Sequence, residues 1–238
     1  MIAAVSYGEL SAMMPNAGGQ YVYLKEAYNK LIAFLFGWSF FAVIQTGTIA
    51  AVGVGFSKFA AYLIPSLSDE NILLDLGAFQ LNAAQIVSII TIVFLTYLNS
   101  RGVKDSKTLQ TVLTIIKILS LFGLIVFGFI LAAKAEVWDV NWTDVWETKS
   151  YNLDTKQWTP IAGTALLAGI SAAMVGSLFS SDAWNGVTFI AAELKNPKRN
   201  VGLSLFLGTF IVTIIYVLTN LMYLAVIPLE EIATAKSD

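Results

Sequence analysis

The sequence predicts an all-α membrane protein with several spanning helices. Of its 238 residues, 57% are hydrophobic and only 13% are charged. A soluble domain of this length carries about 25% charged residues. The chain therefore has too few charges to coat a water-facing surface, and lipid must be its main solvent. Its longest apolar runs also exceed the roughly 20 residues that a helix needs to cross a bilayer.

Five apolar stretches are long enough to span. The expected spanning helices cover residues 31–64, 81–100, 108–133, 161–194 and 199–227, the fourth of them interrupted by polar residues. A sixth stretch, residues 1–14, is apolar but too short, and we interpret it as a truncated helix. The chain is thus predicted to be one partial membrane domain over residues 1–238.

The charges between the helices predict the orientation. Lysine and arginine predominate in loops 15–30, 101–107 and 195–199, whereas acidic residues predominate around residues 69–75 and in loop 134–160. Because cytoplasmic loops are enriched in Lys and Arg, the first three loops are expected to be cytoplasmic and 134–160 to be an outer loop. We expect a multi-pass protein of the plasma or inner membrane.

The absent residue types exclude several classes of chemistry. The chain has no cysteine and no histidine. This excludes disulfides, thiolate nucleophiles, most zinc sites and every His-based triad. We expect no enzyme activity, no catalytic residue, no metal, no cofactor and no nucleic-acid partner.

Lys117 is the first candidate functional residue. It lies inside the apolar stretch 108–133, beyond easy reach of the cytoplasmic interface. A lysine at the bilayer centre costs about 2.5–3.5 kcal/mol, so it normally faces a polar cavity or a partner. The alternative is that its long side chain extends to the interface.

The second candidate is the polar interruption at residues 176–186, which contains Asp182, Asn185 and two adjacent serines. These residues are unfavourable in a continuous lipid-facing helix but suit a broken one, whose free backbone groups bind substrate in many transporters. Helix-end N–H groups would suit the carboxylate of an amino acid, and carbonyls or Asp182 its ammonium group. The alternative is a kink satisfied by neighbouring helices.

A third polar patch lies midway along stretch 31–64. Gln45 and Thr46 could line a cavity, although hydrogen bonding between packed helices is the favoured explanation.

Three segments resemble the amino acid–polyamine–organocation superfamily, and within it the L-type amino acid transporter-like permeases. The segments begin with Ser6-Tyr7-Gly8-Glu9-Leu10, Asn99-Ser100-Arg101-Gly102 and Phe179 to Asn185, and they continue into residues 14–24, 103–117 and 193–200. The resemblance covers nearly the whole chain. It implies a LeuT-type fold of inverted repeats, of which this chain would hold part of helix two through helix seven. The chain would then be a fragment, lacking the first helix and helices eight onward.

The resemblance also implies roles for particular residues. Lys117 falls on a lysine that occupies the cation position of sodium-coupled relatives, which implies sodium independence. The substrate-binding residues would be Phe179, Ser180, Ser181, Asp182, Ala183, Trp184 and Asn185. Ser181 and Ala183 depart from the tyrosine and glycine that relatives often have there. No cysteine is present for a disulfide-linked heavy chain.

The resulting hypothesis is secondary active transport of an amino acid by alternating access, with substrate bound at the broken helix. Sodium-independent exchange and proton-coupled uptake both remain open, as do the amino acid carried and the oligomeric state. The alternative is a membrane sensor or assembly subunit that keeps the fold and transports nothing. The expected partners are the amino acid and the lipid bilayer.

Overall fold

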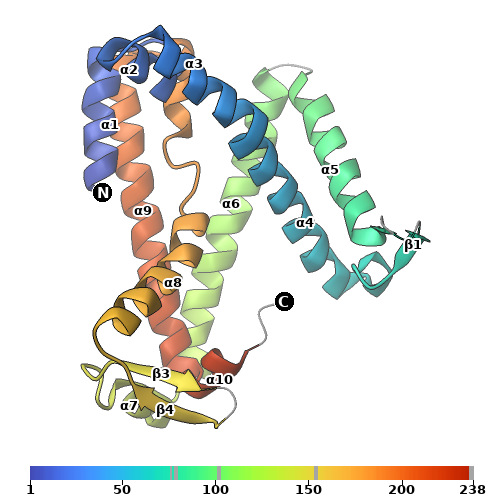
Figure 1. The fold of residues 1–238 in the computed structure, drawn as a ribbon, viewed down its shortest axis with the longest axis vertical. Helices are drawn as coiled ribbons and strands as arrows, with labels where there is room; N and C mark the ends of the chain where they lie inside the picture. The colour runs from blue at the N-terminus through green and yellow to red at the C-terminus, as the bar shows by residue number, and fades with distance from the viewer. Residues whose placement is uncertain (76, 78–79, 101–102, 153–154, 236–238) are drawn as a thin grey trace. The chain divides into compact units, whose positions relative to one another are not determined.

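The computed structural model describes residues 1–75, 77, 80–100, 103–152 and 155–235, with the backbone alone at 103–106. The described chain is mainly helical (Figure 1). It divides into two compact units. The first comprises Met1–Gln20 and the chain from Ile116 onward, and the second comprises Tyr21–Ile115.

The first unit contains the polar break. Its helical elements are α1 (Ile2–Met13), the part of α6 (Val103–Phe127) from Ile116, the π-helical η3 (Gly128–Ala132), α7 (Ala135–Trp142), α8 (Thr164–Ser180), the 3-10 segment η4 (Gly186–Glu193), α9 (Pro197–Val226) and α10 (Leu229–Thr234). Strands β3 (Lys149–Asn152) and β4 (Gln157–Pro160) form an antiparallel hairpin.

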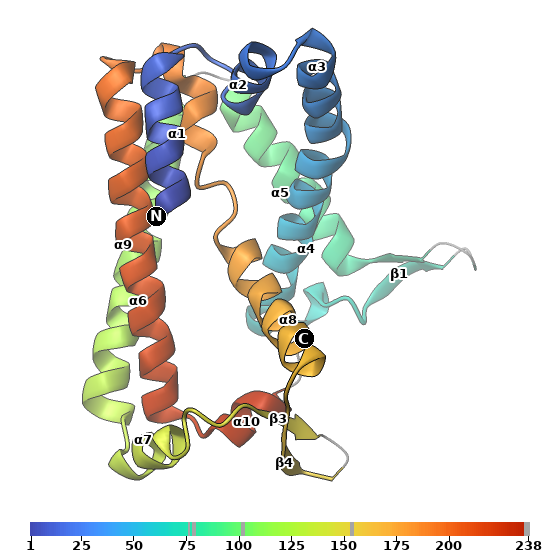
Figure 2. The same ribbon diagram turned by 60° about the vertical axis from the view of Figure 1, so that its left-hand side comes forward.

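Helix α1 packs along the N-terminal half of α9 (Figures 1 and 2). The two backbones lie close together at Gly8 and Gly202, where a Cβ added to Gly8 would lie 3.1 Å from the Gly202 Cα. Around this crossing, Ala4, Val201 and Leu205 are buried to 1% exposure or less. Small residues at the crossing let the two backbones meet, as is typical of helix pairs in membranes.

Asn141 of α7 holds the C-terminal end of α9. Its amide nitrogen donates to the carbonyls of Leu224, at 2.8 Å, and Ile227, at 2.9 Å, and its side-chain oxygen accepts from the Leu229 N–H at 3.0 Å. The last carbonyls of a helix lack N–H partners within the helix, so the Asn141 amide supplies donors that α9 itself does not have. Asn141 itself is 7% exposed.

We expect Asn141→Ala to lower the free energy of unfolding by about 2 kcal/mol, because three hydrogen bonds of about 1 kcal/mol each are lost and water replaces them in part. Thermal unfolding of the purified protein in detergent measures the change. Thr143→Ala is the control, since among the described residues that hydroxyl bonds only the nearby Asp139 carbonyl, at 2.8 Å. Equal unfolding temperatures for the two variants would contradict the role of Asn141.

The second unit is built on a pair of long helices. Its elements are α2 (Gln20–Ala27), α3 (Lys30–Ser39), the π-helical η1 (Phe40–Gln45), α4 (Thr46–Leu63), the 3-10 turn η2 (Pro65–Leu67), strands β1 (Ile72–Asp75) and β2 (Gln80–Asn82), α5 (Ala83–Ser100) and the start of α6. Helix α4 packs on α5, where the Ser57 and Ser88 hydroxyls lie 3.3 Å apart.

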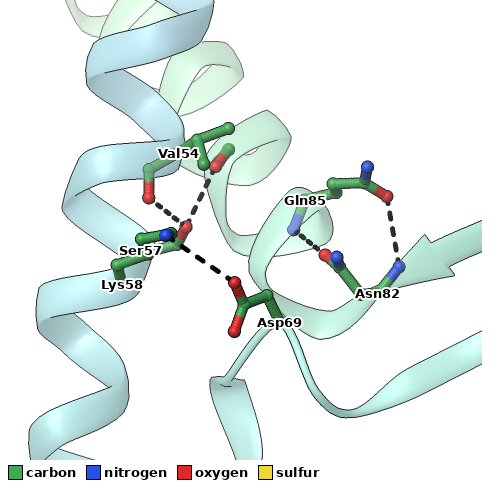
Figure 3. A network of polar contacts seen from close by, with 7 residues as sticks. Val54, Ser57, Lys58, Asp69, Asn82 and Gln85 are labelled. Atoms are coloured by element: carbon green, nitrogen blue, oxygen red, sulfur yellow. Dashed lines mark hydrogen bonds and ion pairs between the residues drawn. The ribbon is translucent and has the colours of Figure 1, made fainter. Parts of the chain in front are cut away.

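Polar contacts close the end of this helix pair (Figure 3). The Lys58 ammonium lies 3.9 Å from the Asp69 carboxylate. Asn82 and Gln85 exchange two bonds: the Gln85 N–H donates to Asn82 Oδ1, and the Asn82 N–H donates to Gln85 Oε1. This reciprocal pair caps the N-terminus of α5 and fixes where that helix begins.

Among the described residues, four helices are long and apolar enough to cross a membrane: Lys30–Leu63, Ala83–Ser100, Lys107–Ala132 and Pro197–Val226. The apolar α8 is shorter. The expectation of an all-α chain omits the two hairpins. Strand β2 takes the first two residues of the expected helix 81–100, so that α5 begins at Ala83. The predicted loop 15–30 contains helix α2, and the predicted outer loop 134–160 contains α7 and the β3–β4 hairpin.

Candidate functional site

Helix α8 ends at Ser180 because its last residues bond backward to the preceding turn. The Ser180 and Ser181 hydroxyls both donate to the Ser177 carbonyl, at 3.1 and 2.8 Å. Serine hydroxyls that bond the backbone in this way compete with the helical ladder. Ala183 then adopts a φ of +60°, a left-handed conformation that is uncommon for a residue with a Cβ. Figure 2 shows the irregular link that follows α8.

A cavity of about 550 Å³ lies at this break, within the first unit. Residues 180–184 form one wall, and the start of the chain at Met1, Ala3 and Ala4 forms another. Helix α9 contributes the rest of the lining, which includes the polar side chains Ser204, Thr209, Thr213 and Tyr216. A cavity of this volume lies in the range of small-molecule sites.

Tyr216 fixes the end of α8 at the cavity. Its hydroxyl donates to the Ser180 carbonyl at 2.8 Å, so α9 satisfies an acceptor that the broken helix leaves open. A second cavity of about 350 Å³ shares Ser181, Thr213 and Tyr216 and continues to Asn220. Sequence reasoning missed these α9 residues. The available signal was the recurrence of polar residues every three to five positions along an apolar helix.

The predicted site residues separate into two groups. Ser180, Ser181, Asp182, Ala183 and Trp184 line the 550 Å³ cavity, and the Asp182 carboxylate makes no hydrogen bond or ion pair with any described residue. Phe179 and Asn185 do not line it. Phe179 is 60% exposed. The carbonyl of Asn185 accepts bonds from the N–H and hydroxyl of Thr188.

The lining does not include Lys117, Gln45 or Thr46. Lys117 is exposed on α6, and its side chain has no hydrogen bond or ion pair within the described part of the chain. Gln45 and Thr46 belong to the second unit, where η1 passes into α4. The Thr46 hydroxyl donates to the Phe41 carbonyl at 2.8 Å, which satisfies it within its own helix.

Charged groups of the β3–β4 region form a separate cluster. The Lys149 ammonium lies 2.7 Å from Glu147 and 3.7 Å from Asp144. The hydrogen bond with Glu147 raises the pKa of Lys149 above its usual range. Over the described residues, no group of three or more His, Cys, Asp or Glu side chains could hold a metal ion.

Comparison with known proteins identifies similar chains. The family model described as "Amino acid permease" matches residues 1–238. The chain is 27% identical to the human b(0,+)-type amino acid transporter 1 and 23% identical to the mouse Asc-type amino acid transporter 1. It is 25% identical to the serine/threonine exchanger SteT of Bacillus subtilis. These alignments cover 98–99% of this chain but only 40–46% of the relatives, so the chain spans less than half their length.

Proposed function

Because this chain belongs to the amino acid permease family and is a multi-pass membrane protein, we propose that the complete protein carries amino acids across the plasma membrane. The observation that carries the proposal is the cavity at the broken helix. There the Asp182 carboxylate, which has no partner among the described residues, lies beside the end of α8. Transport proteins of this kind bind substrate at interrupted helices near the membrane midplane.

The chemistry of the cavity suits one end of an amino acid. The C-terminal end of a helix carries a partial negative charge, and α8 ends at the cavity wall. Asp182 adds a full negative charge there. Together they attract the ammonium group of the substrate. The substrate carboxylate would be held by backbone N–H groups, including those of the helix expected to precede this chain.

Alternating access in a LeuT-type fold would complete the cycle. Segments outside this chain would close the cavity, and Lys117 would tie α6 to the first helix at the position of the cation in sodium-coupled relatives. Transport would then be independent of sodium. Both exchange and proton coupling are compatible with this arrangement. The name of the bacterial relative, a serine/threonine exchanger, favours testing small hydroxylated amino acids first.

Flux in proteoliposomes tests the proposal, using the complete reading frame around this chain. Uptake of labelled amino acids only into preloaded vesicles would identify an exchanger. Uptake into empty vesicles along a pH gradient would identify proton coupling. Binding without flux would overturn transport in favour of a membrane sensor.

Asp182→Asn is expected to raise the half-saturating substrate concentration by about tenfold, because a hydrogen bond to a charged group contributes about 1.5 kcal/mol more than a neutral one. The replacement keeps the size and removes the charge. Competition assays with amino acids and with their deaminated analogues measure the effect. If the variant had the same affinity and the same preference for the ammonium group, Asp182 would be a structural residue only.

A further inference from the structure

The loop that precedes α2 is bound to the segment that follows the broken helix. The Gly18 N–H donates to the Phe189 carbonyl at 3.2 Å. Gly19 has a φ of +48°, and a Cβ at this position would overlap the Thr188 hydroxyl. Thr188 is fully buried and donates to the Asn185 carbonyl at 2.8 Å. Close backbone approach therefore holds the loop on η4.

Gln20, the first residue of α2 and the next residue after this loop, is connected to the wall of the cavity through a side-chain relay. The Gln20 amide donates to the Tyr7 hydroxyl. The Tyr7 ring lies edge-on to the Trp184 indole, with centroids 5.0 Å apart and an interplanar angle of 67°. Trp184 lines the 550 Å³ cavity, whereas Tyr7 and Gln20 do not.

Both rings of the relay pack on buried hydrophobic side chains. Tyr7 and Trp184 both pack against the buried cluster of Ala4, Ala191, Val201 and Leu205, which joins α1, η4 and α9. Packing on this cluster restricts the tilt of both rings. The Gln20 bond fixes the outer end of Tyr7, and the edge-on contact passes that constraint to the indole.

We propose that Tyr7 is a positioning residue for the substrate: held by Gln20, it orients Trp184 and couples the loop before α2 to the cavity wall. The proposal rests on the proposed function, because Trp184 matters only if the cavity binds substrate. If the loop is loosened, the orientation of Trp184 at the cavity wall should change, although every group that lines the cavity is still present.

Transport by the complete protein gives the first test. Tyr7→Phe and Gln20→Leu each remove the same hydrogen bond, and each is expected to raise the half-saturating substrate concentration about three- to tenfold. Because they break one shared bond, the double variant should be no worse than the more affected single variant. Gln20→Glu, whose carboxylate can accept a bond from the Tyr7 hydroxyl, should keep the affinity close to that of the unaltered protein. Tyr28→Phe is the matched control, since Tyr28 is 67% exposed. Additive losses, or no loss, would overturn the relay.

A spectroscopic arm separates this proposal from the proposed function. The protein is labelled with 5-fluorotryptophan, and the ¹⁹F resonance of Trp184 is the one missing from Trp184→Phe. Tyr7→Phe and Gln20→Leu should shift or broaden that resonance, and Tyr28→Phe should not. An unmoved resonance overturns the relay whether or not the protein transports. A moved resonance in a protein that carries no amino acid would retain the relay between loop and cavity wall and refute the proposed function alone.

Discussion

Lys117→Ala is expected to reduce amino-acid transport by about 100-fold while leaving membrane insertion intact. A candidate span begins at Lys107, and Lys117 lies ten residues further along it. The Cα of Lys117 is therefore about 15 Å from the start of the span. A charge at such depth normally has a partner or faces a polar cavity, and its side chain has no partner in the described part of this chain. We therefore propose that its partner lies outside the described residues. Loss of one member of such a charged contact costs about 3 kcal/mol, which is roughly 100-fold.

Lys58→Ala is the matched control for this variant. Lys58 also lies in a candidate span, but its ammonium pairs with Asp69 at 3.9 Å and both side chains are about half exposed, at 46% and 50%. Exposed ion pairs of this kind contribute about 0–1 kcal/mol. Initial flux rates, normalised to protein in the vesicles, should fall sharply for Lys117→Ala and little for Lys58→Ala. Equal rates for Lys117→Ala and the unaltered protein would refute the proposal that Lys117 ties α6 to the first helix.

The sequence predicts the long helices well because their signal is composition alone. A run of about 20 apolar residues has one stable form in lipid, where every backbone group must be satisfied within the segment. The hairpins and α2 lie where the chain leaves such runs. There the residues that form turns and caps determine the secondary structure. Strand β1 (Ile72–Asp75) begins with three apolar residues, and periodicity does not distinguish an apolar run this short from the end of a helix. The π-helical turns at Phe40–Gln45 and Gly128–Ala132 carry no signal in the apolar pattern.

The candidate site is predictable in part for a similar reason. Asp182 and the two serines are conspicuous in an apolar stretch, so the break at their position could be expected. Tyr216 and Thr213 are not conspicuous, because single hydroxyls in a spanning helix usually bond their own backbone. Only the packing of α9 against the break reveals that Tyr216 reaches the Ser180 carbonyl. Tyr7 belongs to one of the segments that carry the family resemblance. Its contact with Trp184, which lies in the turn between α8 and η4, joins residues 177 positions apart in the sequence.

Gly8→Leu is expected to separate α1 from α9 and to lower the free energy of unfolding by about 3 kcal/mol, at the upper end of overpacking effects. The Cβ alone would lie 3.1 Å from the Gly202 Cα, and backbone atoms cannot move aside as a flexible side chain does. The helices would have to part over the crossing where Ala4, Val201 and Leu205 are buried. Because Ala4 and Leu205 also line the cavity, substrate binding should be lost together with stability.

Gly55→Leu controls for the change of residue type, since a Cβ at Gly55 of α4 meets no atom within 4 Å. In both variants a helical glycine becomes a good helix former, so intrinsic propensity favours each replacement equally. Unfolding temperature and the monodisperse fraction in detergent should fall for Gly8→Leu and hold or rise for Gly55→Leu. If the two variants unfolded at the same temperature, the Gly8–Gly202 crossing would not be the contact that holds α1 on α9. A smaller fall for Gly8→Ala, which adds only the Cβ, would show that backbone separation sets the cost.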